Sequence, residues 1–126
     1  MGWMFHQAGY SATTWNIGDL SNWDTSNVTS MSSMFSSVGR SAAVVDIGTL
    51  NVYATSVIYM FHDANSMKAT LNIHTNPTSY SEMFANAATN SGASIKVNYK
   101  STVTNINKLI NTKSSNSNVV KGSVIN

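Results

Sequence analysis

The sequence predicts an α/β fold, a short right-handed solenoid of about four coils with parallel strands on one face and short helices on the other. A Met-Phe pair recurs at Met4, Met34, Met60 and Met83, so successive pairs lie 30, 26 and 23 residues apart. Each pair lies in a helix-like apolar pattern, and a strand-like segment lies between successive pairs. Self-similarity at a period in this range is typical of repeat proteins.

The helices are predicted from apolar residues three or four positions apart. Between residues 25 and 39 these positions are Val28, Met31, Met34, Phe35 and Val38. Such spacing places them on one face of a helix. The same pattern predicts helices over residues 55–64 and 78–87, the end of a helix at residues 3–5, and a last helix around residues 106–110.

The strands are predicted over residues 15–20, 45–50, 71–74 and 95–99. The last two alternate apolar and polar residues, as a half-buried strand does. In the first two the alternation breaks at Gly18 and Gly48. A β-bulge at each glycine would return Leu20 and Leu50 to the inner face.

A helix between successive strands implies parallel strands joined by right-handed crossovers. One coil cannot bury its apolar face alone, and stacking gives the coils a shared core. We therefore predict one domain over residues 1–126, with repeats over residues 1–99 and a capping helix and strand over residues 100–126.

The composition excludes some kinds of site and makes others improbable. The chain has no cysteine, which excludes disulfides and thiolate sites, and no apolar run as long as a membrane span. All five acids precede residue 83, whereas five of the seven basic residues follow residue 95. Lysines near the end favour a polar cap over a patch for an anionic polymer. Nucleic-acid binding is weakly supported because no aromatic run accompanies them.

The stretch from Leu20 to Phe35, LSNWDTSNVTSMSSMF, resembles the repeat of BspA-like leucine-rich-repeat surface proteins of bacteria. The phrase is degenerate in the later coils, where Tyr53 replaces Trp23. The resemblance implies a leucine-rich-repeat-like solenoid, display on a cell surface, and binding to proteins or host matrix, with no catalytic residue. Residues 118–125 look like the terminal cap strand of such repeats.

No arrangement of residues indicates catalysis, a cofactor or a metal. No carboxylate pair, nucleophile elbow or phosphate-binding loop is present. His6 and His62 occupy equivalent places, but two coils separate them by roughly 10 Å, with Ser36 between, so a shared metal site is not expected. Trp23 and Tyr53 follow their strands at equivalent positions, and packing at the corner of each coil is favoured over an exposed aromatic ladder.

The best binding candidates are the polar residues that point outward from the strands. We expect them to form a ladder over the sheet, which would bind a protein or glycan ligand. They are Asn16, Asp19, Asp46, Thr49, Asn72, His74, Lys96 and Asn98.

The resulting hypothesis is a non-enzymatic binding module of an exported bacterial surface protein, located outside the cell. The alternative is the receptor-binding end of a phage or phage-like tail protein. The chain opens inside a repeat and would leave Trp3, Phe5 and Ile17 exposed. This predicts either the C-terminal part of a longer chain or a homodimer through the first coil.

Overall fold

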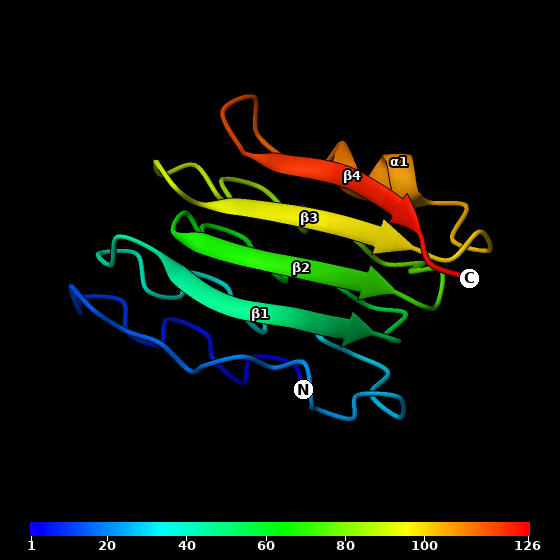
Figure 1. Ribbon diagram of the computed structural model, residues 1–126, viewed down its shortest axis with the longest axis horizontal. Coiled ribbons are helices and arrows are strands. Elements are labelled where there is room, and N and C mark those ends of the chain that lie inside the picture. The colour runs from blue at the N-terminus through cyan, green and yellow to red at the C-terminus, as the bar shows by residue number, and fades with distance from the viewer.

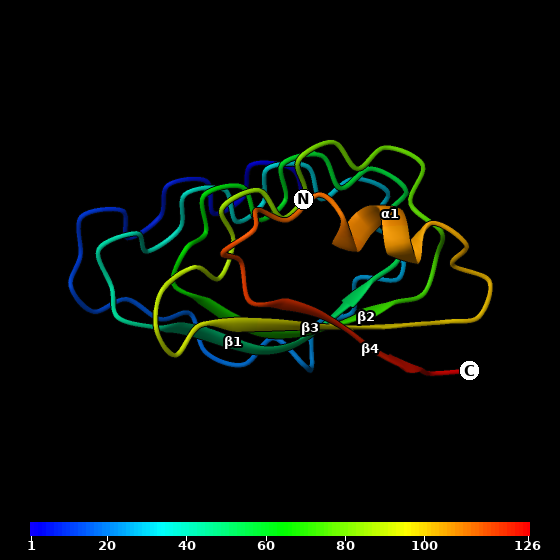
Figure 2. The same ribbon diagram turned by 90° about the horizontal axis from the view of Figure 1, so that it is seen from above.

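The computed structural model describes residues 1–126 as a solenoid of about three turns with two layers. One layer is a parallel four-stranded sheet of order β1-β2-β3-β4, with bounds Val45–Val52, Met67–Ile73, Ser94–Tyr99 and Val119–Val124 (Figure 1). The other layer is a stack of irregular coils, with the short helix α1, Ile106–Ile110, at its C-terminal end (Figure 2). The predicted parallel sheet and solenoid are confirmed.

The predicted helices over residues 25–39, 55–64 and 78–87 are wrong. These regions instead contain runs of consecutive turns, as does the start of the chain; we call them the turn rows, residues 2–11, 32–41, 58–63 and 81–88. The single α-helix is α1, which lies where the last helix was predicted. The fold is therefore a β-solenoid with few helices.

The backbone hydrogen bonds explain why turns replace helices. The amides of Met31, Ser33, Phe35 and Ser37 donate to carbonyls of the next coil, at 2.8–2.9 Å. The amides of the residues between them close turns within the row, as Met34 N does to Met31 O at 3.2 Å. In an α-helix every backbone amide donates to the carbonyl four residues earlier. Amides that donate to the next coil cannot do so, which excludes a helix here.

A four-residue backbone repeat accompanies this bonding. Each turn row contains two residues four apart that have a left-handed backbone, with φ between 51° and 64°. Three of the rows have a third such residue two positions later, at Gly9, Gly39 and Ala88. The first left-handed column of the stack is Trp3, Ser33, Tyr59 and Glu82, and the second is Gln7, Ser37, Asp63 and Asn86. Apolar residues spaced three or four apart still face the core, because a backbone repeat of four residues returns the chain to the same side of the row.

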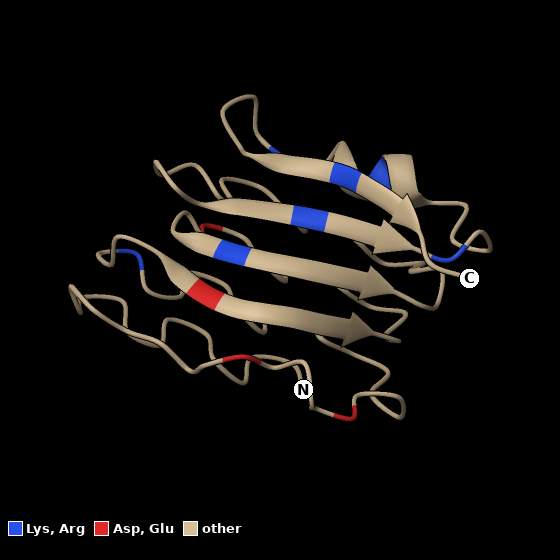
Figure 3. Ribbon diagram, in the orientation of Figure 1, with Lys and Arg blue, Asp and Glu red and all other residues tan.

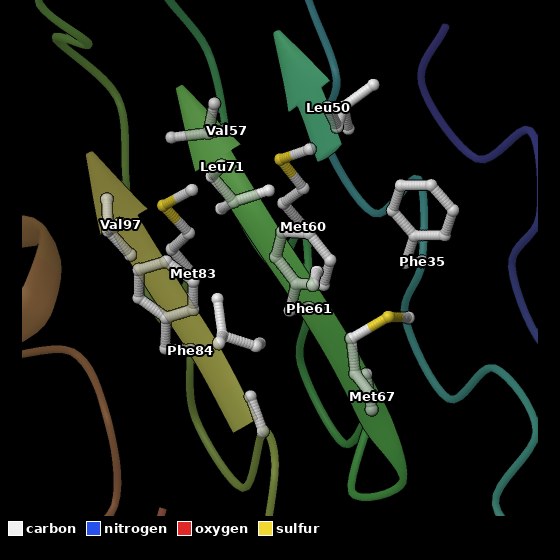
Figure 4. Close-up of a cluster of buried hydrophobic side chains, with 14 of the residues drawn as sticks. Phe35, Leu50, Val57, Met60, Phe61, Met67, Leu71, Met83, Phe84 and Val97 are labelled. Atoms are coloured by element: carbon white, nitrogen blue, oxygen red, sulfur yellow. The ribbon is translucent and has the colours of Figure 1, made fainter. Parts of the chain in front are cut away.

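The core lies between the sheet and the turn rows. Phe5, Phe35, Phe61 and Phe84 stack along the solenoid axis, with successive ring centroids 5.6, 5.3 and 5.8 Å apart and planes within 12° of parallel. Figure 4 shows the last three of these rings and the methionines beside them facing the strand side chains. The phenylalanines of the recurring Met-Phe pairs thus form an internal ladder that joins each coil to the next, and the methionines of the last three pairs are buried beside it.

The strand predictions hold with two corrections. The strand expected at residues 15–20 is irregular, and its Leu20 amide bonds to Ile47 O at 2.9 Å. β2 begins at Met67, earlier than predicted. The bulge at Gly48 is confirmed, since the register between β1 and β2 shifts there and Leu50 is fully buried.

The C-terminal segment completes the last turn row. Phe84 N donates to the Thr112 hydroxyl and Asn86 N to the Ser114 hydroxyl, both at 3.0 Å. In the preceding row the equivalent amides of Phe61 and Asp63 donate to backbone carbonyls. Side-chain hydroxyls therefore replace the missing carbonyls of a further coil.

The phenylalanine ladder should dominate stability. Phe61 is fully buried between two other rings, so Phe61→Ala should lower the free energy of unfolding by about 3–5 kcal/mol. Urea denaturation measures this. Met4→Ala is the control, because Met4 is 53% exposed and its loss should cost only about 0.5 kcal/mol. A loss below about 1 kcal/mol for Phe61→Ala would contradict the ladder's role.

The hydroxyl cap can be tested separately. Thr112→Val keeps the side-chain shape but leaves Phe84 N without its acceptor, so the free energy of unfolding should fall by about 1–3 kcal/mol. Thr104→Val is the matched control, because the Thr104 hydroxyl accepts only an exposed bond from Asn76. Equal losses in the two variants would show that the Thr112 hydroxyl does not cap the row.

Candidate functional site

The outer face of the sheet carries the polar residues predicted as binding candidates. Buried and more exposed positions alternate along β1, β2 and β3, so every second side chain points away from the core. Charge along this face changes with the stack, with acids on β1 and the segment before it and lysines on β2, β3 and β4 (Figure 3). The eight predicted residues divide into three local groups.

Asn16, Asp19 and Asp46 line a shallow hollow of about 290 Å³ with Gly18 and Gly48. Each side chain accepts a local backbone bond: Asn16 Oδ1 from Gly18 N at 2.8 Å, Asp46 Oδ1 from Gly48 N at 2.9 Å, and Asp19 Oδ1 from Ser21 N at 2.9 Å. The Asp19 pKa is lowered, chiefly by bonds from the Ser21 amide and hydroxyl. This hollow is acidic and its carboxylates are held by the backbone.

Thr49 and Lys96 line a second hollow of about 380 Å³, which shares Asp46 and Gly48 with the first. Lys68 and Thr70 of β2 also line it. The register places Asp46 opposite Lys68 and Thr70 opposite Lys96. The two hollows therefore form one continuous surface, acidic at one end and basic at the other, which we call the outer sheet site.

Asn72 and Asn98 belong to an amide ladder with Asn51. Asn72 Nδ2 donates to Asn51 Oδ1 at 3.3 Å, and Asn98 Nδ2 donates to Asn72 Oδ1 at 3.2 Å. Ser123 N completes the ladder by donating to Asn98 Oδ1 at 2.9 Å. These amides bond to one another, which favours a structural role for them in the sheet.

His74 lies at the end of this ladder. Its Nε2 is 3.0 Å from Asn51 Oδ1, and its ring stacks on Tyr53 at a centroid distance of 4.4 Å and an interplanar angle of 7°. A carbonyl oxygen only accepts, so Nε2 carries the proton and donates. Its Nδ1 is buried without a partner. Burial, and secondly the charge of Lys100, lowers the pKa of His74.

Sequence reasoning missed Lys68, Thr70 and Asn51. The first two lie before the start of the strand predicted at residue 71, although Met67, Ala69 and Leu71 continue its alternation. Extending that alternation upstream would have found them. Asn51 follows the glycine that interrupts the pattern in β1, and only the observed bulge places it beside Asn72.

The remaining sequence candidates fall on other parts of the molecule. Tyr53 packs on His74 and Trp23 packs near Phe5, with ring centroids 6.1 Å apart, as expected for coil corners. His6 and His62 lie in the turn rows and line one hollow there, with Ser36 between them. The structure contains no group of three or more His, Cys, Asp or Glu residues placed to hold a metal.

A family model described as "Mycoplasma protein of unknown function, DUF285" matches residues 1–122. No curated protein and no solved structure matches the chain. The structure has no helix that is both long and apolar enough to span a membrane.

The surroundings of His74 predict a pH effect on stability. Because its pKa is lowered in the folded state, the unfolded state binds the proton more readily. Stability should therefore fall as the pH falls below the ordinary histidine value of 6.5, until the lowered pKa is passed. Urea denaturation at several pH values should show a smaller acid-dependent loss for His74→Gln than for the wild type.

His62→Gln is the control for that experiment, since His62 is a partly exposed histidine on the opposite layer. The same acid dependence in wild type and His74→Gln would contradict this role of His74.

Proposed function

We propose that this chain, which belongs to the DUF285 family of mycoplasma proteins of unknown function, is a non-catalytic binding module that recognises a protein ligand through the outer sheet site. The observation that carries the proposal is the continuous surface lined by Asp46, Lys68 and Lys96. Repeat solenoids commonly bind partners on an extended face of this kind.

The chemistry of the outer sheet site favours a polar protein segment over a neutral glycan. No aromatic side chain lines either hollow, so a sugar ring has no surface on which to stack. Lys68 and Lys96 are offset along neighbouring strands, which suits carboxylates on an extended segment. Asp46 and Asp19 at the other end suit a cationic side chain. A ligand with complementary charges at both ends would bind in one direction.

The rigidity of the site supports the same role. Asp46 and Asp19 are held by backbone amides, so they need little ordering when a ligand binds. The amide ladder fixes the adjoining part of the sheet. Binding therefore costs little conformational entropy on the side of the module.

The resemblance between the repeat phrase and BspA-like leucine-rich-repeat proteins supports a proposal for the cellular setting. We propose that the module acts on an exported protein at the bacterial surface, where it contacts proteins of a host or neighbouring cell. The many Ser, Thr and Asn residues of the chain support solubility in such a setting with little charge.

Binding should depend on the two lysines of the outer sheet site. The probe is a panel of purified extracellular-matrix and cell-surface proteins on sensor chips, titrated with the 126-residue chain. Lys68→Gln and Lys96→Gln should each weaken binding to a panel protein about tenfold, the effect of losing roughly 1.4 kcal/mol. Affinity should also fall as salt is raised.

Lys108→Gln is the matched control, because Lys108 is exposed on α1, in the other layer. Its affinity should equal that of the wild type. If no panel protein binds, the proposed recognition of a cell-surface protein is contradicted. If binding survives both Lys68→Gln and Lys96→Gln, the outer sheet site is not the binding surface.

A further inference from the structure

A separate hollow lies on the opposite layer, over the turn rows. Its volume is about 310 Å³, at the lower end of the range for small-molecule sites. We call it the aromatic hollow, and it is lined by Trp3, His6, Ser33, Ser36, Tyr59, His62 and Glu82. These residues come from four successive turn rows, so the hollow depends on the stacking of the coils. It shares no residue with the outer sheet site.

Two aromatic pairs flank the hollow. Trp3 packs edge-to-face with His6 at a centroid distance of 4.7 Å, and Tyr59 packs in the same way with His62 at 5.3 Å. Trp3 is 63% exposed and Tyr59 is 39% exposed, so both present ring surface to solvent. The two pairs stand on the first and third rows.

The row between the pairs carries small residues. Ser33 and Ser36 are nearly buried and form the floor of the hollow. A large side chain at either position would fill the space between the aromatic pairs. The concavity therefore results from the alternation of aromatic, small and aromatic residues along the stack.

The left-handed backbone at Trp3 and Tyr59 makes the presence of large aromatic side chains there informative. Trp3 and Tyr59 both lie in the first left-handed column, with φ of 64° and 56°. Bulky residues rarely adopt this conformation, whereas Asn and Asp tolerate it. The second left-handed column does contain Asp63 and Asn86. Folding alone would be served better by such residues at positions 3 and 59, so the exposed rings indicate a surface role.

We propose that the aromatic hollow binds one pyranose ring of a neutral glycan, with Trp3 on one side and Tyr59 on the other. A pyranose has apolar C–H faces, which pack on aromatic rings, and a rim of hydroxyls, which need hydrogen-bond partners. The flanks and floor of the hollow offer both kinds of contact. No lysine or arginine lines the hollow, which disfavours a phosphate or another anion.

Polar groups for the hydroxyl rim come from the edge of the hollow. His62 Nε2 lies 3.9 Å from Glu82 Oε1, and both residues line the hollow. Hydrogen bonding to the Glu82 carboxylate, and secondly its charge, raises the pKa of Tyr59. The single phenol proton is directed at Glu82, so the phenol oxygen can accept a hydrogen bond from a sugar hydroxyl. A carboxylate and an imidazole side by side are suitable partners for two neighbouring hydroxyls.

Spacing favours a puckered ring over a flat one. Coils are about 4.8 Å apart, so the rows of Trp3 and Tyr59 are roughly 10 Å apart. A flat aromatic ligand between two rings would need only about 7 Å, two contacts of about 3.5 Å each. A chair-shaped sugar is thicker and fills the larger separation.

The test uses the 126-residue chain with methyl β-glucopyranoside, methyl β-galactopyranoside and N-acetylglucosamine as probes, and indole as the flat comparison. Amide chemical shifts around Trp3, Ser36 and Tyr59 should move with at least one sugar. Trp3→Asn and Tyr59→Asn should each lower that affinity about tenfold. Both variants should stay folded, because Asn tolerates the left-handed backbone.

Gln7→Asn is the matched control, since Gln7 has the same left-handed backbone but does not line the hollow. It should bind the sugar as the wild type does. Trp3→Phe should keep part of the affinity, because it keeps a ring. Three results would overturn the proposal: no response to any of the three sugars, an equal response to indole, or unchanged affinity in both Asn variants.

Discussion

Hydrogen bonding between coils, in both layers at once, is the constraint on which this structure depends. In the sheet it joins parallel strands, and in the turn rows it joins alternate amides to the next coil. Most backbone–backbone hydrogen bonds lie outside the regular helix and strands, in turns, loops and strand ends, so the fold does not depend on the sheet alone. Two bonded layers fix the register, and equivalent residues must stack.

Stacking in register makes each position of the repeat a column through the molecule. The Phe column is apolar and forms the internal ladder, while the Asn column on the sheet satisfies its amides by bonding along the stack. Columns that face solvent are free to vary. The two faces differ in this way: charged hollows lie on the sheet and an aromatic hollow lies on the turn rows. Their ligands should differ in chemistry for the same reason.

The sequence was sufficient for the repeat, the parallel sheet, the bulge at Gly48 and the buried Met-Phe pairs of the last three turn rows, because these follow from which residues must be buried. It was misleading for the turn rows. The positions of Met31, Met34, Phe35 and Val38 fit a helix and a run of bonded turns equally well. The two differ only in which carbonyl accepts the hydrogen bond of each amide. The accepting carbonyl belongs to the neighbouring coil, and the apolar periodicity within one coil carries no information about it.

The same limit applied to the sites. Asn16, Asp19, Asp46, Thr49 and Lys96 could be placed on one face by alternation along single strands, and they line the two outer hollows. The aromatic hollow could not be found this way, because it joins residues of four rows through a left-handed column that helical spacing hides.

The turn rows also give the stack a direction. The amides that bond between coils point toward the C-terminal end. In the last row, the amides of Phe84 and Asn86 donate to the hydroxyls of Thr112 and Ser114. The carbonyls of the turn rows point the other way, and those of Gly2, Met4 and His6 in the first row accept no backbone bond. Two first rows placed edge to edge would set acceptors against acceptors, which forms no hydrogen bonds. A partner at this edge must therefore present N–H donors, as another coil of the same polarity does, and a symmetric dimer would need to be held by side chains instead.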